Sequence, residues 1–444
     1  MSYVKVPKRL TLPQQMAGTL LCLLVYRLLS CVPLPFMNTA MIEILMGAGG
    51  SMGLLNVLTG GNLSRMSIAA LGVSPYITAS IFVQLFGIII PPVAAMQRDG
   101  AVGRKKIKRL TVVLSGIFAV LTASGMMYGY WRAGLLTVGA WYGAVVPGAL
   151  MVAASLLVTW MGQLIDDKFF GNGVSLLLLA GIVSTLPGEL WLIGKSVWIA
   201  YQAVGVAVFA VVLFVLFMFV YFMLRSERVY QVSYMTKISG APLPKEDSVL
   251  SLKLLSSSVM PVIFASSVLA VPAVVQAIAG HEIEWLKIFQ TNYWLWPEIP
   301  WASAGIPIYL GLIFFFTRYS QSMSMNEIEM ADALRKSGCV IEGVAPGLET
   351  ELFLRKEMAQ LNRLGALMLS LVAFLPIVGG QLFHLPSVSV FGTSMILIVS
   401  VVMDTWYVFR VEYKSLRYTR CQKKMIEGQQ IKNQFVLLDQ KVRG

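Results

Sequence analysis

Residues 75–80 read PYITAS and residues 261–266 read PVIFAS. The two stretches share the pattern Pro-x-Ile-x-Ala-Ser, and each opens an apolar segment, one in each half of the chain. Membrane proteins built from internal repeats place their working site at the interface between the repeats. The pattern therefore indicates a doubled membrane unit, although four matches in six residues can also arise by chance in a chain rich in Ile, Ala and Ser.

The composition is that of an integral membrane protein. Of the 444 residues, 57% are hydrophobic and only 13% are charged, whereas about 25% of the residues of a soluble domain are charged. Because a spanning helix needs about 20 mostly apolar residues, and because no segment shows the alternation of a membrane barrel, we predict an all-α polytopic membrane protein. Its ten predicted spans are 17–36, 74–92, 111–130, 143–162, 173–193, 203–224, 257–278, 303–322, 364–383 and 391–409.

The basic residues predict the orientation of these spans. With both termini in the cytoplasm, 29 of the 35 Lys and Arg residues fall in inside segments and four in outside segments, as the positive-inside rule requires. The net charge of +13 is then cytoplasmic surface charge, although a basic face could also meet a ribosome. The first apolar run, 17–36, has full span length and no small-residue cleavage site, so we expect a retained anchor.

Three segments between the spans are unusually long. Residues 37–73 are moderately apolar and rich in Gly, which predicts either a segment tucked into the helix bundle or a loose outside loop. Residues 225–256 and 323–363 are long inside segments, and connections of such length are usually functional or disordered. The mixed charges and turn residues of the second one predict a folded cytoplasmic protrusion.

Few polar groups lie within the predicted spans. Arg27 lies in the middle of its span, and Arg318 and Asp404 lie late in theirs; the spans contain no Asp/Glu/His relay for protons or sodium. We expect Arg27 to pair with backbone carbonyls or an acidic neighbour, because a charge in the bilayer centre is costly. The chain has only two His and four scattered Cys residues, so neither a metal site nor a disulfide framework is expected. The cysteines are Cys22, Cys31, Cys339 and Cys421.

Several stretches together resemble SecY, the central subunit of the protein-conducting channel. These are GGNLSRMSIAALGVSPYITASIFVQL at 60–85, GNGVSLLLLAGIVSTLP at 171–187, MPVIFASS at 260–267 and GTSMILIVSVVMDT at 392–405, with PLP at 33–35 and GVAPGLET at 343–350. They follow one another in the order expected for that family. The resemblance thus covers most of the chain.

The resemblance implies a fold of two pseudo-symmetric, inverted five-helix halves around a central pore. Residues 1–200 would form the first half and residues 201–409 the second, followed by a basic cytoplasmic tail at 410–444. A plug at about 38–64 would rest below the pore. The motif-bearing second and seventh spans would face each other across a lateral gate.

The resemblance also implies a ring of aliphatic residues that seals the pore. The ring would consist of Ile77, Ile81, Leu178, Ile182, Ile263 and Leu397. A narrow apolar constriction resists ions by dewetting, yet it offers a sliding polypeptide no fixed hydrogen-bond partner. Residues four apart share a helical face, so Ile77 pairs with Ile81 and Leu178 with Ile182. Ordinary core packing is the alternative for these residues.

Further roles follow from the same matches. The resemblance implies plug residues Ile42, Leu45, Met52 and Leu55, and gate residues Pro75, Ser80, Gln84, Pro261 and Ser266. Gln84 would tune the gate or would simply be a packed polar residue.

The cytoplasmic loops depart from the family pattern where a partner would dock. The docking positions are Arg228, Ala345, Pro346 and Gly347. The family usually has Arg at the position of Ala345, Pro at that of Glu342, and a second Arg at that of Val229. Neither Ala nor Val supplies the donor fork of Arg. This favours an accessory SecY paralogue with its own motor, or else a housekeeping channel of a divergent lineage.

The leading hypothesis is a passive channel, without catalytic residues, metal or cofactor, in the bacterial cytoplasmic membrane. It would move unfolded secretory polypeptides with signal sequences across the membrane, or insert them laterally into the lipid bilayer. The resemblance implies a SecE-like partner and possibly a SecG-like one, with a SecA-type motor or a ribosome supplying the force. The alternatives are a repeat-built small-molecule secondary transporter and, least favoured, an intramembrane enzyme.

Overall fold

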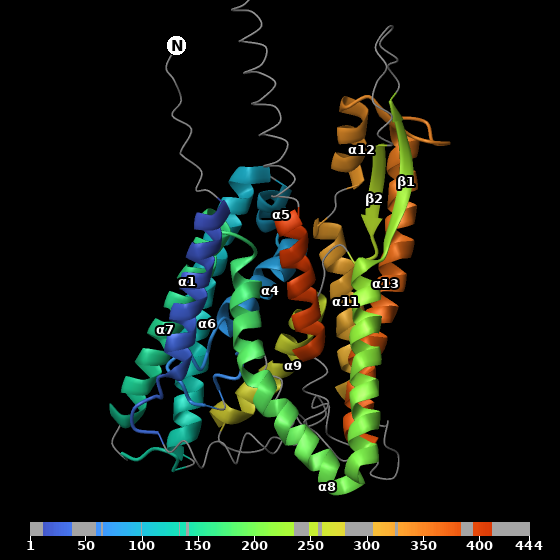
Figure 1. Ribbon diagram of the computed structural model, residues 1–444. Coiled ribbons are helices and arrows are strands. Elements are labelled where there is room, and N and C mark those ends of the chain that lie inside the picture. Colours follow the sequence, from blue (N-terminus) through green and yellow to red (C-terminus); the bar gives the residue numbers. More distant parts are fainter. Residues whose placement is uncertain are drawn as a thin grey trace, which may run out of the picture. The chain divides into compact units, whose positions relative to one another are not determined.

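The computed structural model describes residues 12–37, 59–63, 65–98, 100–132, 134–138, 142–234, 248–255, 260–279, 305–324, 327–382 and 394–410 (Figure 1). Most of these residues are helical. The long helices are α1 (Leu12–Cys31), α4 (Ser74–Ile89), α6 (Gly100–Arg132), α7 (Tyr142–Lys168), α8 (Gly173–Arg225), α9 (Met260–Ala279), α11 (Gly305–Ser324) and α13 (Leu348–Leu382). Two short helices are α5 (Pro91–Arg98) and α12 (Glu327–Lys336), and residues 394–410 are also helical.

Helix lies in each of the ten predicted spans. Among the described residues, five helical stretches are long and apolar enough to cross a membrane by length and composition: Lys105–Arg132, Tyr142–Lys168, Gly173–Ile199, Val204–Arg225 and Leu348–Gly379. The helical membrane fold is therefore confirmed, whereas the number of ten crossings stays a prediction.

Helix α8 carries two predicted spans in succession. Its backbone leaves helical geometry at Gln202, where φ is 54° and ψ is −151°. This break falls between the predicted spans 173–193 and 203–224 and beside the predicted boundary between the halves at 200. The helix begins at a side-chain cap, because Asn172 Oδ1 accepts a hydrogen bond of 3.3 Å from the Ser175 backbone N–H.

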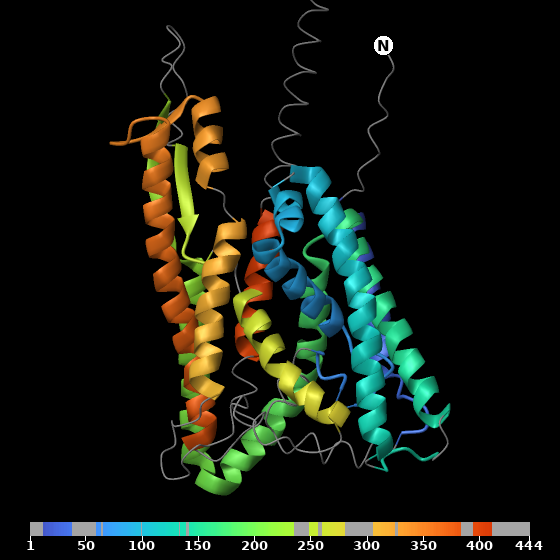
Figure 2. The same ribbon diagram turned by 180° about the vertical axis from the view of Figure 1, so that it is seen from behind.

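The two motif-bearing helices are in contact with each other. Helix α4 packs on α6, and α9 contacts α4, α6 and α11. Figure 2 shows α4 in blue beside α9 in yellow. Helix α1 packs against α7 and α8, while α11 lies along α13.

The stretch that follows α1 is buried where the structure describes it. Residues 59–63 and most of 66–73 are buried, and the Leu34 backbone N–H donates to the Met66 carbonyl at 2.8 Å. This confirms the tucked segment for residues 59–73, apart from Ser64, and excludes a loose loop there. The predicted plug residues Ile42, Leu45, Met52 and Leu55 lie outside the described residues.

A small antiparallel sheet joins the two long inside segments. It consists of β1 (Glu227–Tyr234), β2 (Ser248–Lys253) and β3 (Cys339–Ile341) in the order β2-β1-β3. Tyr230 pairs with Leu250, and Ser233 pairs with Val340. The strands lie outside the predicted spans and are the one departure, among the described residues, from the all-α expectation.

The chain divides into two compact units, Met1–Val401 and Val402–Gly444. In the second unit the structure describes residues 402–410, which are helical.

Candidate functional site

The six predicted pore residues are all buried. Their exposed fractions lie between 2% and 4%. Ile77 and Ile81 lie on α4, Leu178 and Ile182 on α8, Ile263 on α9, and Leu397 in the helix at 394–410. Four helices that are distant in sequence thus each bury a branched aliphatic side chain at the matched position. This burial fits both a closed ring and ordinary packing, so the ring stays a prediction.

The repeated motif builds the first turns of both helices. Pro75 is the second residue of α4, and Pro261 is the second residue of α9. Proline is favoured there because the first helical N–H groups have no partner within the helix. Ser266 Oγ donates back to the Val262 carbonyl at 2.9 Å. Ser80 Oγ instead accepts a hydrogen bond of 3.2 Å from Gln84 Nε2.

Sequence reasoning missed a contact of the predicted gate residue Gln84 with a third helix, α11. The hydroxyl of Tyr319 on α11 donates to the backbone carbonyl of Gln84 on α4 at 2.5 Å. Because the acceptor is a backbone atom, no side-chain pattern indicates this bond. Pro75, Pro261 and Ser266 are buried, whereas Ser80 and Gln84 are half-buried. Their role in gating stays a prediction.

The described end of the predicted plug, residues 59–63, is fastened to α1 and α8. We call residues 59–63 the plug root. Asn62 Nδ2 donates to the hydroxyl of buried Tyr26 and to the Thr59 carbonyl, both at 2.8 Å. A Cβ atom on Gly181 would lie 2.6 Å from Cα of Gly60. Gly60 has a φ of +69°, where glycine is favoured.

Arg27 has a different partner from those expected. Its Nη1 donates to Ser184 Oγ at 2.7 Å, and Ser184 Oγ donates to the Gly181 carbonyl at 2.6 Å. Arg65 also reaches this residue, with Nη2 at 3.4 Å from the Ser184 carbonyl. A hydroxyl, rather than a carbonyl or a carboxylate, therefore receives the Arg27 side chain. A serine partner was not foreseen, because serine is common throughout the spans.

The predicted docking residue Arg228 makes an ion pair within the protein. Its Nη1 lies 2.6 Å from Oε2 of Glu357 on α13, and the Tyr230 hydroxyl donates to the same oxygen at 2.6 Å. Desolvation and the hydrogen bond to Glu357 raise the pKa of Tyr230 to about 12. The Tyr230 ring also packs edge-on against Phe353, with ring centroids 5.3 Å apart. Arg228 thus ties β1 to α13.

The other docking positions lie at the start of α13. Ala345 and Pro346 are exposed, and Gly347 has a φ of +109°. Thr350 Oγ1 donates to the Ala345 carbonyl at 2.8 Å. The loop is therefore fastened to the helix that follows it, while the side chain of residue 345 faces outward.

The described residues contain no group of three or more His, Cys, Asp and Glu side chains that could hold a metal ion. In the same part of the chain, Cys22, Cys31 and Cys339 are free thiols.

Comparison with known sequences identifies a family. The SecY family model matches residues 67–406. The protein translocase subunit SecY of Streptococcus gordonii is 32% identical over 397 residues, covering 86% of this chain and 89% of that protein. The protein of the same name from Staphylococcus aureus is 29% identical, covering 87% and 91%.

Solved structures share the fold. One is described as a protein-conducting channel, and its match spans 92% of this chain and 95% of the channel chain, with a TM-score of 0.66 at 18% identity. A SecY structure described for the plug domain that maintains its membrane seal gives a TM-score of 0.64 at 18% identity, with the same coverage. Sec61 in the canine ribosome–channel complex from the endoplasmic reticulum gives 0.61 at 17% identity, again with the same coverage.

These findings support a protein-translocation channel over the alternative of a repeat-built small-molecule secondary transporter. The family model covers most of the chain, and the fold matches channel structures. The chain belongs to the SecY family.

Proposed function

We propose that this protein is the pore-forming subunit of a passive channel in the bacterial cytoplasmic membrane. It moves unfolded polypeptides across the membrane or releases their apolar segments sideways into the lipid. The force comes from a separate SecA-type motor or from a ribosome, and the channel itself catalyses no reaction. Both termini face the cytoplasm, as the distribution of Lys and Arg predicts.

The single observation that carries the pore assignment is the burial of the six matched aliphatic residues. Each is at most 4% exposed, although together they come from four different helices. Closed against one another, such side chains form an apolar constriction that dewets and holds back ions. A polypeptide can separate them because aliphatic contacts are non-directional.

The plug and the lateral gate control the opening of the channel. In the resting channel, the bond from Asn62 to Tyr26 and the close approach of Gly60 to Gly181 hold the plug root against α1 and α8. Opening of the lateral gate separates α4 from α9, which are in contact in this structure. The bond from Tyr319 to the Gln84 carbonyl makes α4 and α11 move together.

A SecE-like subunit, with or without a SecG-like one, would complete the channel. The ion pair between Arg228 and Glu357 and the absence of Arg at 345 and 229 favour an accessory channel with a dedicated motor. A divergent housekeeping channel remains the second candidate, because the same loops could have changed together with its motor.

Site-specific photocrosslinking tests the pore. A photoreactive amino acid replaces Ile182 in membranes that hold an arrested secretory polypeptide and the motor encoded by the same genome. The matched control is Val183, the next residue on α8, which is 47% exposed. We expect crosslinks from position 182 that move along the polypeptide as it is lengthened, and none from position 183. Equal crosslinking from both positions, or none from 182 while a dedicated substrate is exported, would contradict the assignment.

A further inference from the structure

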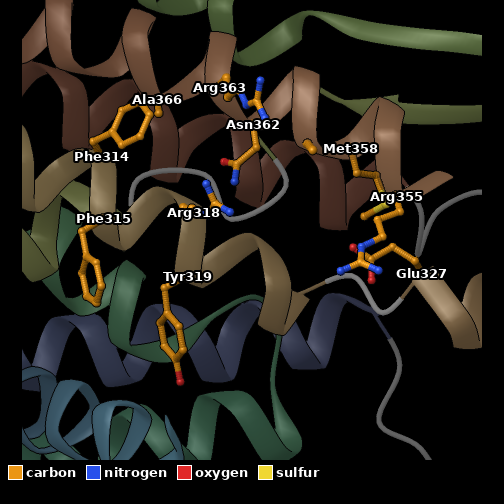
Figure 3. Close-up of a pocket in the computed structure, with 11 residues that line it drawn as sticks. Phe314, Phe315, Arg318, Tyr319, Glu327, Arg355, Met358, Asn362, Arg363 and Ala366 are labelled. Atoms are coloured by element: carbon orange, nitrogen blue, oxygen red, sulfur yellow. The ribbon is translucent and has the colours of Figure 1, made fainter. Parts of the chain in front are cut away.

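A cavity of about 420 Å³ lies between α11 and α13, with one wall residue from α12. We call it the α11–α13 pocket. Figure 3 shows the side chains of Arg318 and Asn362 extending toward one another from the two long helices. At another side of the pocket, Arg355 of α13 and Glu327 of α12 lie beside each other. None of these residues belongs to the predicted pore, plug, gate or docking surface.

The pocket lies at a predicted membrane boundary. Phe314 and Phe315 are exposed lining residues one turn before Arg318, near the end of the predicted span 303–322. Arg363 comes directly before the predicted span 364–383. Arg355 lies eight residues earlier, or about 12 Å farther along the helix axis at 1.5 Å per residue. The lining thus changes from aromatic to basic across the boundary.

Among the residues that the structure describes, the charge of the pocket is not balanced. Three arginines, Arg318, Arg355 and Arg363, face one acidic lining residue, Glu327. In the part of the chain that the structure describes, none of the three arginines forms a salt bridge. A guanidinium group binds a phosphate through two parallel hydrogen bonds. The pocket is therefore suited to an anion with a phosphate group.

A second polar group of the pocket also has no partner in the described part of the chain. Oδ1 of Asn362 is buried and accepts no hydrogen bond from the described residues. An unpaired buried acceptor is costly, so a ligand that brings a hydroxyl donor to this atom would gain stability. A free phosphate ion would satisfy the arginines, but it would leave the exposed surfaces of Phe314 and Phe315 uncovered.

We propose that the α11–α13 pocket binds the headgroup of an anionic glycerophospholipid. The phosphate lies against Arg318 and Arg363, a headgroup hydroxyl donates to Asn362 Oδ1, and the acyl chains run along Phe314 and Phe315. Basic pockets between membrane helices are known to hold such headgroups on the cytoplasmic side. The proposal rests on the predicted membrane boundaries and is independent of the pore assignment.

Native mass spectrometry of the full-length protein in detergent, with any subunit that co-purifies, tests this site. The probes are dioleoyl phosphatidylglycerol, dioleoyl phosphatidylcholine and inorganic phosphate. We expect phosphatidylglycerol to bind, and Arg318→Gln or Arg363→Gln to weaken its binding about fivefold each, the effect of one basic residue at an anionic membrane surface. The matched control is Arg109→Gln, which removes an exposed arginine of α6 outside the pocket.

A fourth variant should strengthen lipid binding, which a folding defect would not do. Glu327→Gln removes the one acidic residue of the lining, so phosphatidylglycerol should bind roughly two- to fivefold more tightly. Equal binding of phosphatidylcholine, or equal weakening by Arg109→Gln, would overturn the proposal. So would displacement of the lipid by millimolar inorganic phosphate, which would indicate a site for a free anion. A short RNA that binds with the same arginine dependence in place of the lipid would likewise overturn it.

Discussion

Replacing Gly181 with Ala should loosen the resting seal of the channel. The new methyl group would lie 2.6 Å from Cα of Gly60 and 3.1 Å from the Tyr26 hydroxyl, whereas carbon atoms in contact are about 3.5–4.0 Å apart. The nearest of these atoms belongs to the backbone, so a side-chain rotation does not relieve the clash. The plug root must therefore move away from α8 by about 1 Å.

The expected magnitude follows from this strain. Overpacking of a well-packed site costs about 1–3 kcal/mol. If the whole strain falls on the closed state, the ratio of open to closed channels rises about 5- to 150-fold, at 1.4 kcal/mol per factor of ten. Movement of the root also breaks the bond between Asn62 and Tyr26, which is 2.8 Å long in the closed arrangement.

Single-channel recording in planar bilayers measures this ratio as the resting open probability. The matched control is Gly194→Ala on the same helix, because a Cβ atom at Gly194 meets nothing within 4 Å. We expect Gly181→Ala to raise the open probability and to lower the melting temperature, whereas Gly194→Ala should leave the open probability unchanged and should not lower the melting temperature. An open probability of Gly181→Ala equal to that of Gly194→Ala would refute the reasoning, because the plug root would then not depend on the contact.

Three further predictions concern the pore and the cytoplasmic loops. Ile182→Asn puts an amide where the side chain is 2% exposed, so resting ion conductance should rise because the constriction wets, whereas Val183→Asn on the exposed side should leave conductance unchanged. The pKa of Tyr230 is about 12 in the folded state, against 10.0 for the free side chain. The neutral side chain therefore stabilises the fold fully below pH 10, and this stabilisation is lost as the pH rises from 10 to about 12. The difference in absorbance at about 295 nm between wild type and Tyr230→Phe should show this late ionisation, and Glu357→Gln should lower its midpoint toward pH 10. Ala345→Arg restores the family's side chain at an exposed position, so pull-down of a housekeeping SecA should increase, and no increase would mean that other loop residues determine the choice of motor.

The presence of the helices, and the starting points of α4 and α9, were predictable from local sequence. Long apolar runs can satisfy their backbone hydrogen bonds in a membrane only as helices or closed barrels, and Pro75 and Pro261 occupy early helical positions where proline is favoured. Burial of Ile77 and Ile263 follows from the same register, because each lies two residues after its proline. These features depend on neighbours within one or two turns.

The sheet between the long inside segments was missed because its pairing is long-range. Strand β2 does carry an alternation, Leu250-Ser251-Leu252-Lys253, of which Leu252 is almost fully buried. Six residues of weak alternation, however, do not indicate their partner. Strand β3 pairs with β1 across about one hundred residues of sequence. The acceptor of Arg228 was missed for the same reason, since Glu357 lies 129 residues away.

The contact between Gly60 of the plug root and Gly181 of α8 could not be assigned from sequence, because each glycine matters only through the other. Their positions nevertheless explain why one turn of α8 serves both the seal and the plug. Ile182 belongs to the predicted ring, and its neighbour Gly181 touches Gly60. Ser184, two residues farther on, receives Arg27 from α1. Because a helix moves as a rigid segment over so few residues, a polypeptide that displaces Ile182 also displaces the surface on which Gly60 rests. Widening of the ring and release of the plug root are then one movement, and for this reason a single methyl group at Gly181 is expected to shift the gating equilibrium of the whole channel.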